Sequence, residues 1–311
     1  MEDAARILVV GSINMDMVVR SLHMPAPGET VLGNGFVTSP GGKGANQAVA
    51  AARLGSHCRM LGRIGEDAFG ESLLKGLRDE GIDCTNVMTT EGEPTGVAMI
   101  VVDARGENSI VVASGANYLL TPDDVFGQAD AFGDIDVVVL QLELPLPTVR
   151  AAIDLAKRNG CRVILDPAPM PKCLSSSICE VDIITPNVTE AEMLTGTKTG
   201  EEKADMNIAM DLIARGAKAA VLKLGSRGSM VVTADGHMAR VRAYNVDIVD
   251  TTAAGDAYTA ALAVCVGEGR PLVEAAKFAN AAGALACTRL GAQSAMPTRH
   301  EVSMLMADQQ Q

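Results

Sequence analysis

The sequence predicts an α/β protein in which helices cover both faces of a mostly parallel sheet. Short apolar runs alternate along the chain with longer amphipathic runs, which is the pattern of strands that alternate with helices. The apolar runs are continuous, as expected for strands that are buried on both faces. Hydrophobic residues make up 48% of the 311 residues, enough for a sizeable core, so we expect residues 1–311 to form a single domain.

The strands and helices are predicted in turn along the chain. The first strand covers residues 6–10 (RILVV), and the first helix, which is rich in alanine, covers residues 43–54 and stops at Gly55. Further strands are predicted at residues 57–63, 136–141, 163–166, 182–185 and 219–224. Further helices are predicted at residues 69–80, 147–159, 189–195 and 203–215.

Two stretches, residues 14–40 and 95–118, depart from this alternation. They are rich in Gly, Pro, Asn and Ser, they contain alternating apolar patterns, and they have no helix of their own. We therefore predict antiparallel strands that extend from the main sheet. A small sheet beside an α/β body is either a lid over the functional site or an added edge, and we favour the lid.

The charge of the chain excludes two classes of partner. The formal net charge is −12 and the pI is about 4.8, without any run of Lys and Arg. Such a chain is repelled by nucleic acids and by anionic membrane surfaces. No apolar stretch is long enough for a membrane span, and the first residues lack the basic region and apolar run of a secretory leader. We expect neither nucleic acid nor membrane as a partner.

The cysteines indicate a reducing compartment. Their number, seven, is odd, no CxxC motif occurs, and most of them lie in apolar stretches. We therefore expect free, buried thiols and a cytoplasmic location. Zinc is not expected, because none of the four His residues pairs with a Cys at ligand spacing.

The motif DTTAAGD, residues 250–256, carries the clearest chemistry. It precedes a predicted helix, so its turn exposes backbone N–H groups that suit the charge developing on a transferring phosphoryl group. Asp256 lies beside these donors and is placed to take the proton of an incoming hydroxyl. The alternative is an ordinary helix start, in which Asp250 or Thr252 is the cap and Asp256 only faces the dipole.

The motif GGKGAN, residues 41–46, offers groups for a sugar or a phosphate. Its glycines let a ligand approach the backbone closely. Lys43 can meet a phosphate, and Asn46 has a donor and an acceptor for a polyol. The alternative is a glycine turn with a solvated lysine.

Polar residues also follow two of the predicted strands. Asn14 and Asp16 follow the first strand, and Glu143 follows the strand at 136–141. Ligands gather at the carboxyl ends of strands in α/β sheets, so these side chains are candidates for gripping sugar hydroxyls. The alternatives are an Asx turn for the first two and a solvated loop carboxylate for Glu143.

Two further segments suit a nucleotide. Asn187 can meet a phosphate, and Glu190, one turn into a predicted helix, can hold Mg²⁺ through water. The alternative is a capping box, in which the two residues cap the helix start. Residues 224–228 (LGSRG) form a glycine turn after a strand and could cradle a nucleotide. Neither a Walker A loop nor a GxGxxG after the first strand occurs, which disfavours an NAD-binding dehydrogenase.

Together, these motifs resemble those of the ribokinase-type carbohydrate kinases, over about residues 6–300. The resemblance implies a ribokinase-like fold and ATP-dependent phosphorylation of D-ribose at O5. It also implies Mg²⁺ and K⁺ as cofactors and a homodimer joined through the lid sheet.

The same resemblance assigns roles to individual residues. Asp256 would be the catalytic base, and the backbone N–H groups of Ala254, Gly255 and Asp256 would form the anion hole, with Ala253 also in the catalytic set. The sugar would be bound by Asn14, Asp16, Gly42, Lys43, Asn46, Glu143 and Asp256. ATP would be bound by Asn187, Glu190, Lys223, Gly225, Ser226, Gly228, Gly255 and Asn280, with Glu190 also acting on Mg²⁺.

The resemblance further implies a monovalent-cation site beside the anion hole. Its ligands, mostly carbonyl oxygens, would come from Asp250, Thr252, Ala286, Arg289, Gly291 and Ala295. Ala295 stands where these kinases carry Ser, which predicts weaker K⁺ binding. Lys223 stands where they commonly carry a small polar residue.

Two other functions remain open. One is a kinase of the same family that acts on another sugar or on a nucleoside. The scarcity of aromatic residues near the lid, with Phe36 as the main candidate, argues mildly against a nucleoside. The other is a non-catalytic sugar-binding or regulatory protein on the same fold, which the presence of Glu190, Gly255 and Asp256 disfavours.

Overall fold

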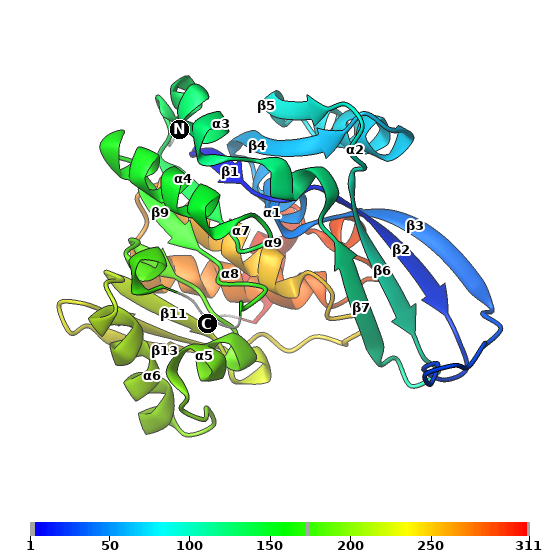
Figure 1. The fold of residues 1–311 in the computed structure, drawn as a ribbon. Coiled ribbons are helices and arrows are strands. Elements are labelled where there is room, and N and C mark those ends of the chain that lie inside the picture. Colours follow the sequence, from blue (N-terminus) through cyan, green and yellow to red (C-terminus); the bar gives the residue numbers. More distant parts are fainter. Residues whose placement is uncertain (1–3, 172–174, 310–311) are drawn as a thin grey trace.

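The computed structural model describes residues 4–171 and 175–309 and consists of a large α/β body from which a smaller sheet projects (Figure 1). The strands of the body are β1 (Arg6–Val10), β4 (His57–Gly65), β5 (Asp83–Thr90), β8 (Val137–Leu140), β9 (Arg162–Leu165), β10 (Ile183–Ile184), β11 (Ala219–Lys223), β12 (Ser229–Thr233) and β13 (Met238–Val241). They form a nine-stranded sheet with the order β13-β12-β11-β10-β9-β8-β1-β4-β5. All neighbours from β11 to β5 are parallel, whereas β12 and β13 are antiparallel to theirs.

Helices cover both faces of this sheet. They are α1 (Lys43–Arg53), α2 (Ala68–Asp79), α3 (Pro122–Gly127), α4 (Leu146–Arg158), α5 (Val188–Thr195), α6 (Glu202–Ala214), α7 (Ala254–Gly267), α8 (Leu272–Ala286) and α9 (Arg299–Asp308). In β1, Ile7 and Val9 belong to a core cluster that includes residues of α1, α2, α7, α8 and α9, while Leu8 and Val10, on the other face, belong to a second cluster that includes residues of α3 to α6. The predicted sandwich is therefore confirmed.

The elements expected from the sequence are present, with ends that differ by about two residues at most. The strands β5, β12 and β13 were not predicted. The strands β5 and β13 lie at the two edges of the sheet and are only partly buried, so they lack the continuous apolar run of the central strands.

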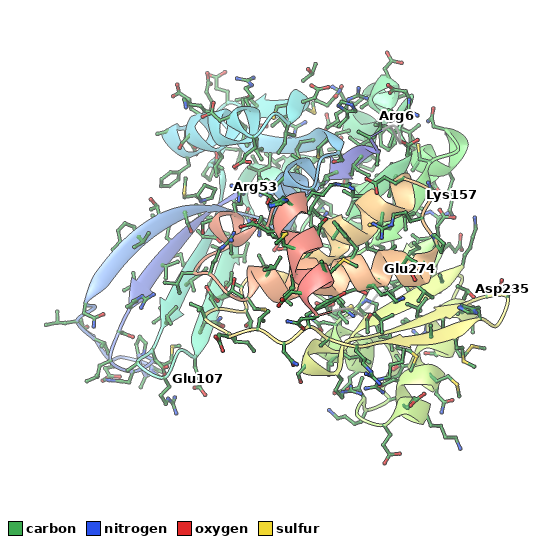
Figure 2. The ribbon with its side chains drawn as sticks, turned by 180° about the vertical axis from the view of Figure 1, so that it is seen from behind. Arg6, Arg53, Glu107, Lys157, Asp235 and Glu274 are labelled. Carbon is green, nitrogen blue, oxygen red and sulfur yellow. The ribbon has the colours of Figure 1, made fainter. Side chains whose placement is uncertain are left out.

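The smaller sheet is separate from the body and contains β2 (Asn14–Arg20), β3 (Gly35–Gly41), β6 (Gly96–Val102) and β7 (Asn108–Ala113), in the order β3-β2-β6-β7. The prediction of antiparallel strands that extend from the main sheet was wrong in two respects. The sheet stands alone, and its central pair, β2 and β6, is parallel. Parallel neighbours need a long crossover, and here the chain passes through the body between them. Figure 2 shows Glu107 at the far tip of this sheet and Asp235 at the opposite end of the molecule.

Two polar clusters fix the smaller sheet to the body. The Asn117 amide accepts from the backbone N–H of Ile13 at 2.9 Å and donates to Asn14 Oδ1 at 2.8 Å, so it clamps the start of β2. The Asp67 carboxylate caps α2 through Gly70 N and also accepts from Thr95 N, directly before β6. Both strands that enter from the body are therefore anchored where they begin.

The described cysteines are free. Cys58, Cys84, Cys161, Cys179 and Cys265 are buried as expected, whereas Cys287 is half-buried, and Cys173 lies outside the described residues. No helix in the described part of the chain has the length and apolar character needed to cross a bilayer.

Candidate active site

The start of α7 has the geometry of an anion-binding turn. Ala253 precedes the helix with φ 57°, a left-handed conformation that is uncommon for a residue other than glycine. No side chain caps this helix, so the predicted alternative of a cap from Asp250 or Thr252 was wrong. The first N–H groups of a helix have no acceptor within it, although that of Ala254 reaches the Thr251 carbonyl at 3.3 Å. The left-handed backbone of Ala253 is strained, and strain of this kind is typical of functional turns.

Asp256 lies in the first turn of α7 and is only 3% exposed. Its Oδ2 accepts from Asn46 Nδ2 at 3.0 Å, and its Oδ1 accepts from Gln47 Nε2 at 3.0 Å. The Lys43 ammonium lies 3.9 Å from Oδ1. The nearby Asp256 carboxylate raises the pKa of Lys43, which therefore stays charged. The carboxylate is thus held on both oxygens by α1 and faces a fixed cation.

Helix α1 can approach Asp256 closely because the first residues of α1 pack against the end of β1. Gly42 has φ 86°, and a Cβ there would lie 2.7 Å from Asn14 N. A Cβ on Gly44 would lie 2.6 Å from Ser12 N. Both positions therefore require glycine, and Gly42 supplies backbone against the start of β2, as expected for the sugar side of the site.

The other residues predicted for the sugar lie around Asp256. Asn14 is buried and bonded to Asn117, and Asp16 is half-buried on the same side of β2. Glu143 accepts from the Ser12 hydroxyl and from Lys43 N, at 3.0 Å for the latter. The alternative of a solvated loop carboxylate was therefore wrong. Asn46 Oδ1 is buried and has no partner among the described residues, which leaves an acceptor for a ligand hydroxyl.

A cavity of about 600 Å³ opens on the other side of the α7 turn. The residues predicted for ATP that line it are Asn187, Lys223, Gly225, Ser226, Gly228, Gly255 and Asn280. Tyr244 and Tyr258 also line it. Neither tyrosine was predicted from the sequence, where their only signal was their position near the DTTAAGD motif.

Asn187 and Glu190 form a capping box at the start of α5, which was the alternative considered for this motif. Both oxygens of the Glu190 carboxylate accept from Asn187, at 2.8 Å from its backbone N and at 2.7 Å from its Nδ2. Burial raises the pKa of Glu190, while the nearby Lys223 ammonium opposes that shift. The box does not exclude a role for Glu190, because the carboxylate remains close to Lys223 at the cavity.

Two buried residues of the site were missed by the sequence analysis. Asp166 follows β9 and binds Lys223 Nζ at 2.8 Å, and Gln47 donates to both Asp166 and Asp256. Gln47 lies next to the predicted Asn46, and Asp166 ends a predicted strand, so their positions were the only available signal.

Three of the predicted cation ligands lie together. Asp250 accepts from Thr252 N at 2.9 Å and from Gly291 N at 2.9 Å. Asp250 N reaches the carbonyl of Cys287, the residue after Ala286. The Arg289 side chain instead donates to Glu301 on α9, so only the Arg289 backbone is available as a cation ligand. Ala295 is buried, and its neighbour Ser294 donates to the Leu290 carbonyl at 2.8 Å.

Comparison with known proteins identifies the family. Residues 4–299 match the model of the pfkB family carbohydrate kinases. The chain belongs to this family. Among its relatives, the ribokinase of Haemophilus influenzae is 40% identical over 95% of this chain and 96% of its own length. The deoxyribokinase of Salmonella typhi is 36% identical over 94% of this chain and 95% of its own length.

A solved structure supports the same membership in the pfkB family. The Arabidopsis thaliana ribokinase complexed with ribose and ATP is 34% identical, has a TM-score of 0.90, and aligns with 97% of this chain and 99% of its own chain. The ribokinase-like α/β fold that the resemblance implied is therefore confirmed.

The Asp16 carboxyl yields a prediction about pH and stability. Burial, together with the Glu143 and Asp256 carboxylates, raises its pKa from 3.8 to about 7. A raised pKa means that the folded state loses stability as the pH rises from the unfolded-state value through the folded one. Asp16→Asn should therefore stabilise the protein increasingly between about pH 4 and about pH 7, reaching about 1–3 kcal/mol.

The measurement is urea unfolding of both proteins across this pH range. Asp79→Asn, which neutralises an exposed carboxylate on α2, is the matched control and should show no such trend. A stabilisation by Asp16→Asn that stays constant with pH would contradict the shifted pKa.

Proposed function

We propose that this protein transfers the γ-phosphoryl group of ATP to O5 of D-ribose, giving D-ribose 5-phosphate and ADP. The observation that carries the proposal is the position of Asp256. Its carboxylate is held by Asn46 and Gln47 at the α7 turn, between the residues predicted for the sugar and the nucleotide cavity. The ribokinases among the relatives indicate the sugar.

On the sugar side, Asp256 takes the proton of the O5 hydroxyl, and O5 attacks the γ-phosphorus. The remaining hydroxyls are bound by Asn14, Asp16, Gly42, Lys43, Asn46 and Glu143. The free Asn46 Oδ1 supports this assignment, because an unpaired buried acceptor gains a partner when a hydroxyl binds.

On the nucleotide side, the bond between the γ-phosphorus and the β–γ bridging oxygen breaks, and ADP leaves. The backbone N–H groups of Ala254, Gly255 and Asp256 stabilise the transferring group. Asn187, Glu190, Lys223, Gly225, Ser226, Gly228 and Asn280 bind ATP. Mg²⁺ would neutralise charge between the β- and γ-phosphates. Glu190 would hold it through water, since both of its oxygens already accept from Asn187.

A coupled assay of ADP formation across a panel of sugars tests the proposal. D-ribose should be the best substrate, and 2-deoxyribose should have kcat/KM at least about tenfold lower, because a missing hydroxyl leaves a buried polar group unpaired. Asp256→Asn should keep ribose and ATP binding and lower kcat by roughly 10²–10⁴-fold.

The outcomes of this assay separate the alternatives. Equal or better turnover of 2-deoxyribose would favour a deoxyribokinase, the activity named for the relative from Salmonella typhi. It would also contradict the assigned sugar contacts. Sugar binding without ADP formation would favour a non-catalytic protein. Near-normal turnover by Asp256→Asn would show that Asp256 is not the catalytic base.

We also propose a K⁺ site formed by Asp250, Thr252, Ala286, Arg289, Gly291 and Ala295. The bonds that join Asp250 to Thr252 and to Gly291 support it, because they bring two separate segments together beside the α7 turn.

Activity should require Mg²⁺ and rise further with KCl at constant ionic strength. A flat response to KCl would reject the site. Ala295→Ser should shift the activation midpoint to lower K⁺, and an unchanged midpoint would exclude the hydroxyl as a ligand.

We further propose that two copies of the chain associate through the smaller sheet. Its exposed apolar residues support this, since Met99 and Val111, which pair across β6 and β7 and so share one face of the sheet, are 62% and 67% exposed. Sedimentation should give a dimer, and Val111→Glu should shift it to a monomer. Met304→Glu, at an exposed position on α9, is the control. A monomer at all concentrations would reject this interface.

A further inference from the structure

A buried cation, Lys223, lies beside the α7 turn, and the reaction described above does not say which part of the nucleotide it contacts. Lys223 ends β11, and its side chain is 10% exposed. Its ammonium donates to Asp166 Oδ1 at 2.8 Å and to Thr259 Oγ1 at 3.4 Å. It lies 3.5 Å from the point that a Cβ on Gly255 would occupy. The charge is therefore fixed next to the backbone assigned to the anion hole.

Asp166 holds this ammonium rigidly. The residue is 1% exposed, and its second oxygen, Oδ2, accepts from Gln47 Nε2 at 3.0 Å and from Thr259 Oγ1 at 3.3 Å. The carboxylate is thus bound from α1, α7 and β11 at once. It cannot rotate away from Lys223 without breaking hydrogen bonds to the other two elements.

The Lys223 ammonium has one hydrogen-bond donor left for a ligand. A lysine ammonium has three protons. Among the described residues, Asp166 and Thr259 are the acceptors of its hydrogen bonds, so one proton remains. Lys223 lines the same cavity as Gly225, Ser226 and Gly255, so an anion in that cavity can reach the remaining proton.

We propose that Lys223 contacts the phosphate chain of the bound nucleotide and that Asp166 is the positioning residue that keeps its ammonium at this place. The inference rests on the proposed function, because it requires a nucleotide in the cavity. It assigns Asp166 a role on both sides of the reaction. Through Gln47, the same carboxylate is linked to the base Asp256.

The competing explanation is structural. A buried carboxylate needs a counter-charge, and Lys223 would then serve only to neutralise Asp166. The two explanations differ when both charges are removed together. A counter-ion is no longer needed in the double variant, whereas a phosphate contact is still missing from it.

The test is calorimetric binding of ATP, ADP and adenosine, with Mg²⁺ present, to the intact protein and to Lys223→Met, Asp166→Asn and the double variant. Lys218→Met, which removes the same charge at the far end of β11, is the matched control. We expect Lys223→Met and the double variant to bind ATP and ADP at least about tenfold more weakly, as expected for a lost charged contact. Adenosine affinity should change by less than about twofold.

Asp166→Asn tests the positioning role. It should weaken ATP binding by at least about threefold while leaving adenosine unchanged, and it should add nothing in the Lys223→Met background, because coupled residues are not additive. If Lys223→Met fails to fold because it leaves Asp166 unpaired, the double variant still answers the question.

Three outcomes would overturn the inference. A double variant that binds ATP as the unmodified protein does would make Lys223 a counter-ion only. Tighter ATP binding by Asp166→Asn would show that Asp166 competes with the phosphates. Equal losses for ATP and adenosine would show a damaged cavity. Failure of the unmodified protein to bind ATP would instead reject the proposed function, and this inference with it.

Discussion

The close packing of α1 against α7 is the constraint on which the site depends. Both helices are rich in buried alanine, so their backbones approach closely in the core of one face of the sheet. Gly44 lets the start of α1 rest on the end of β1. The amides of Asn46 and Gln47 consequently reach Asp256, which lies in the first turn of the other helix. A larger side chain in this interface would separate the helices and detach the carboxylate from its donors.

This packing gathers negative charge that the fold must compensate. The carboxylates around the α7 turn are Asp16, Glu143, Asp166, Glu190 and Asp256, and the lysines among them are Lys43 and Lys223. Desolvated carboxylates remain ionised only where donors or cations face them. Asp256 and Asp166 each have amide donors and a lysine beside them. Burial, together with the nearby Glu143 and Asp256 carboxylates, raises the pKa of Asp16 to about 7. The sugar side therefore contains a carboxyl group, Asp16, that changes protonation near neutral pH.

The sequence predicted the strands and helices of the body because continuous apolar runs and amphipathic runs are local signals. It also singled out Asp256 and Asn46, whose side chains are joined by a hydrogen bond in the structure. It failed at Asp166 and Gln47, whose importance arises only from contacts between distant segments. It failed likewise for the pairing of β2 with β6, because register and direction between strands far apart in the chain are decided by tertiary packing.

The division of the site between two sheets explains why the smaller one matters to the chemistry. Asn14 and Asp16 belong to β2, whereas Asp256 and the nucleotide cavity belong to the body. The chain passes from the body to β2 through the short segment between β1 and β2. The Asn117 side chain is hydrogen-bonded to Ile13 in this segment and to Asn14 at the start of β2. Under the proposed function, a sugar that bound both parts at once would fix the smaller sheet over the α7 turn and would exclude water where the phosphoryl group is transferred. Under the same proposal, sugar binding and protection from hydrolysis would depend on the same few contacts at the start of β2.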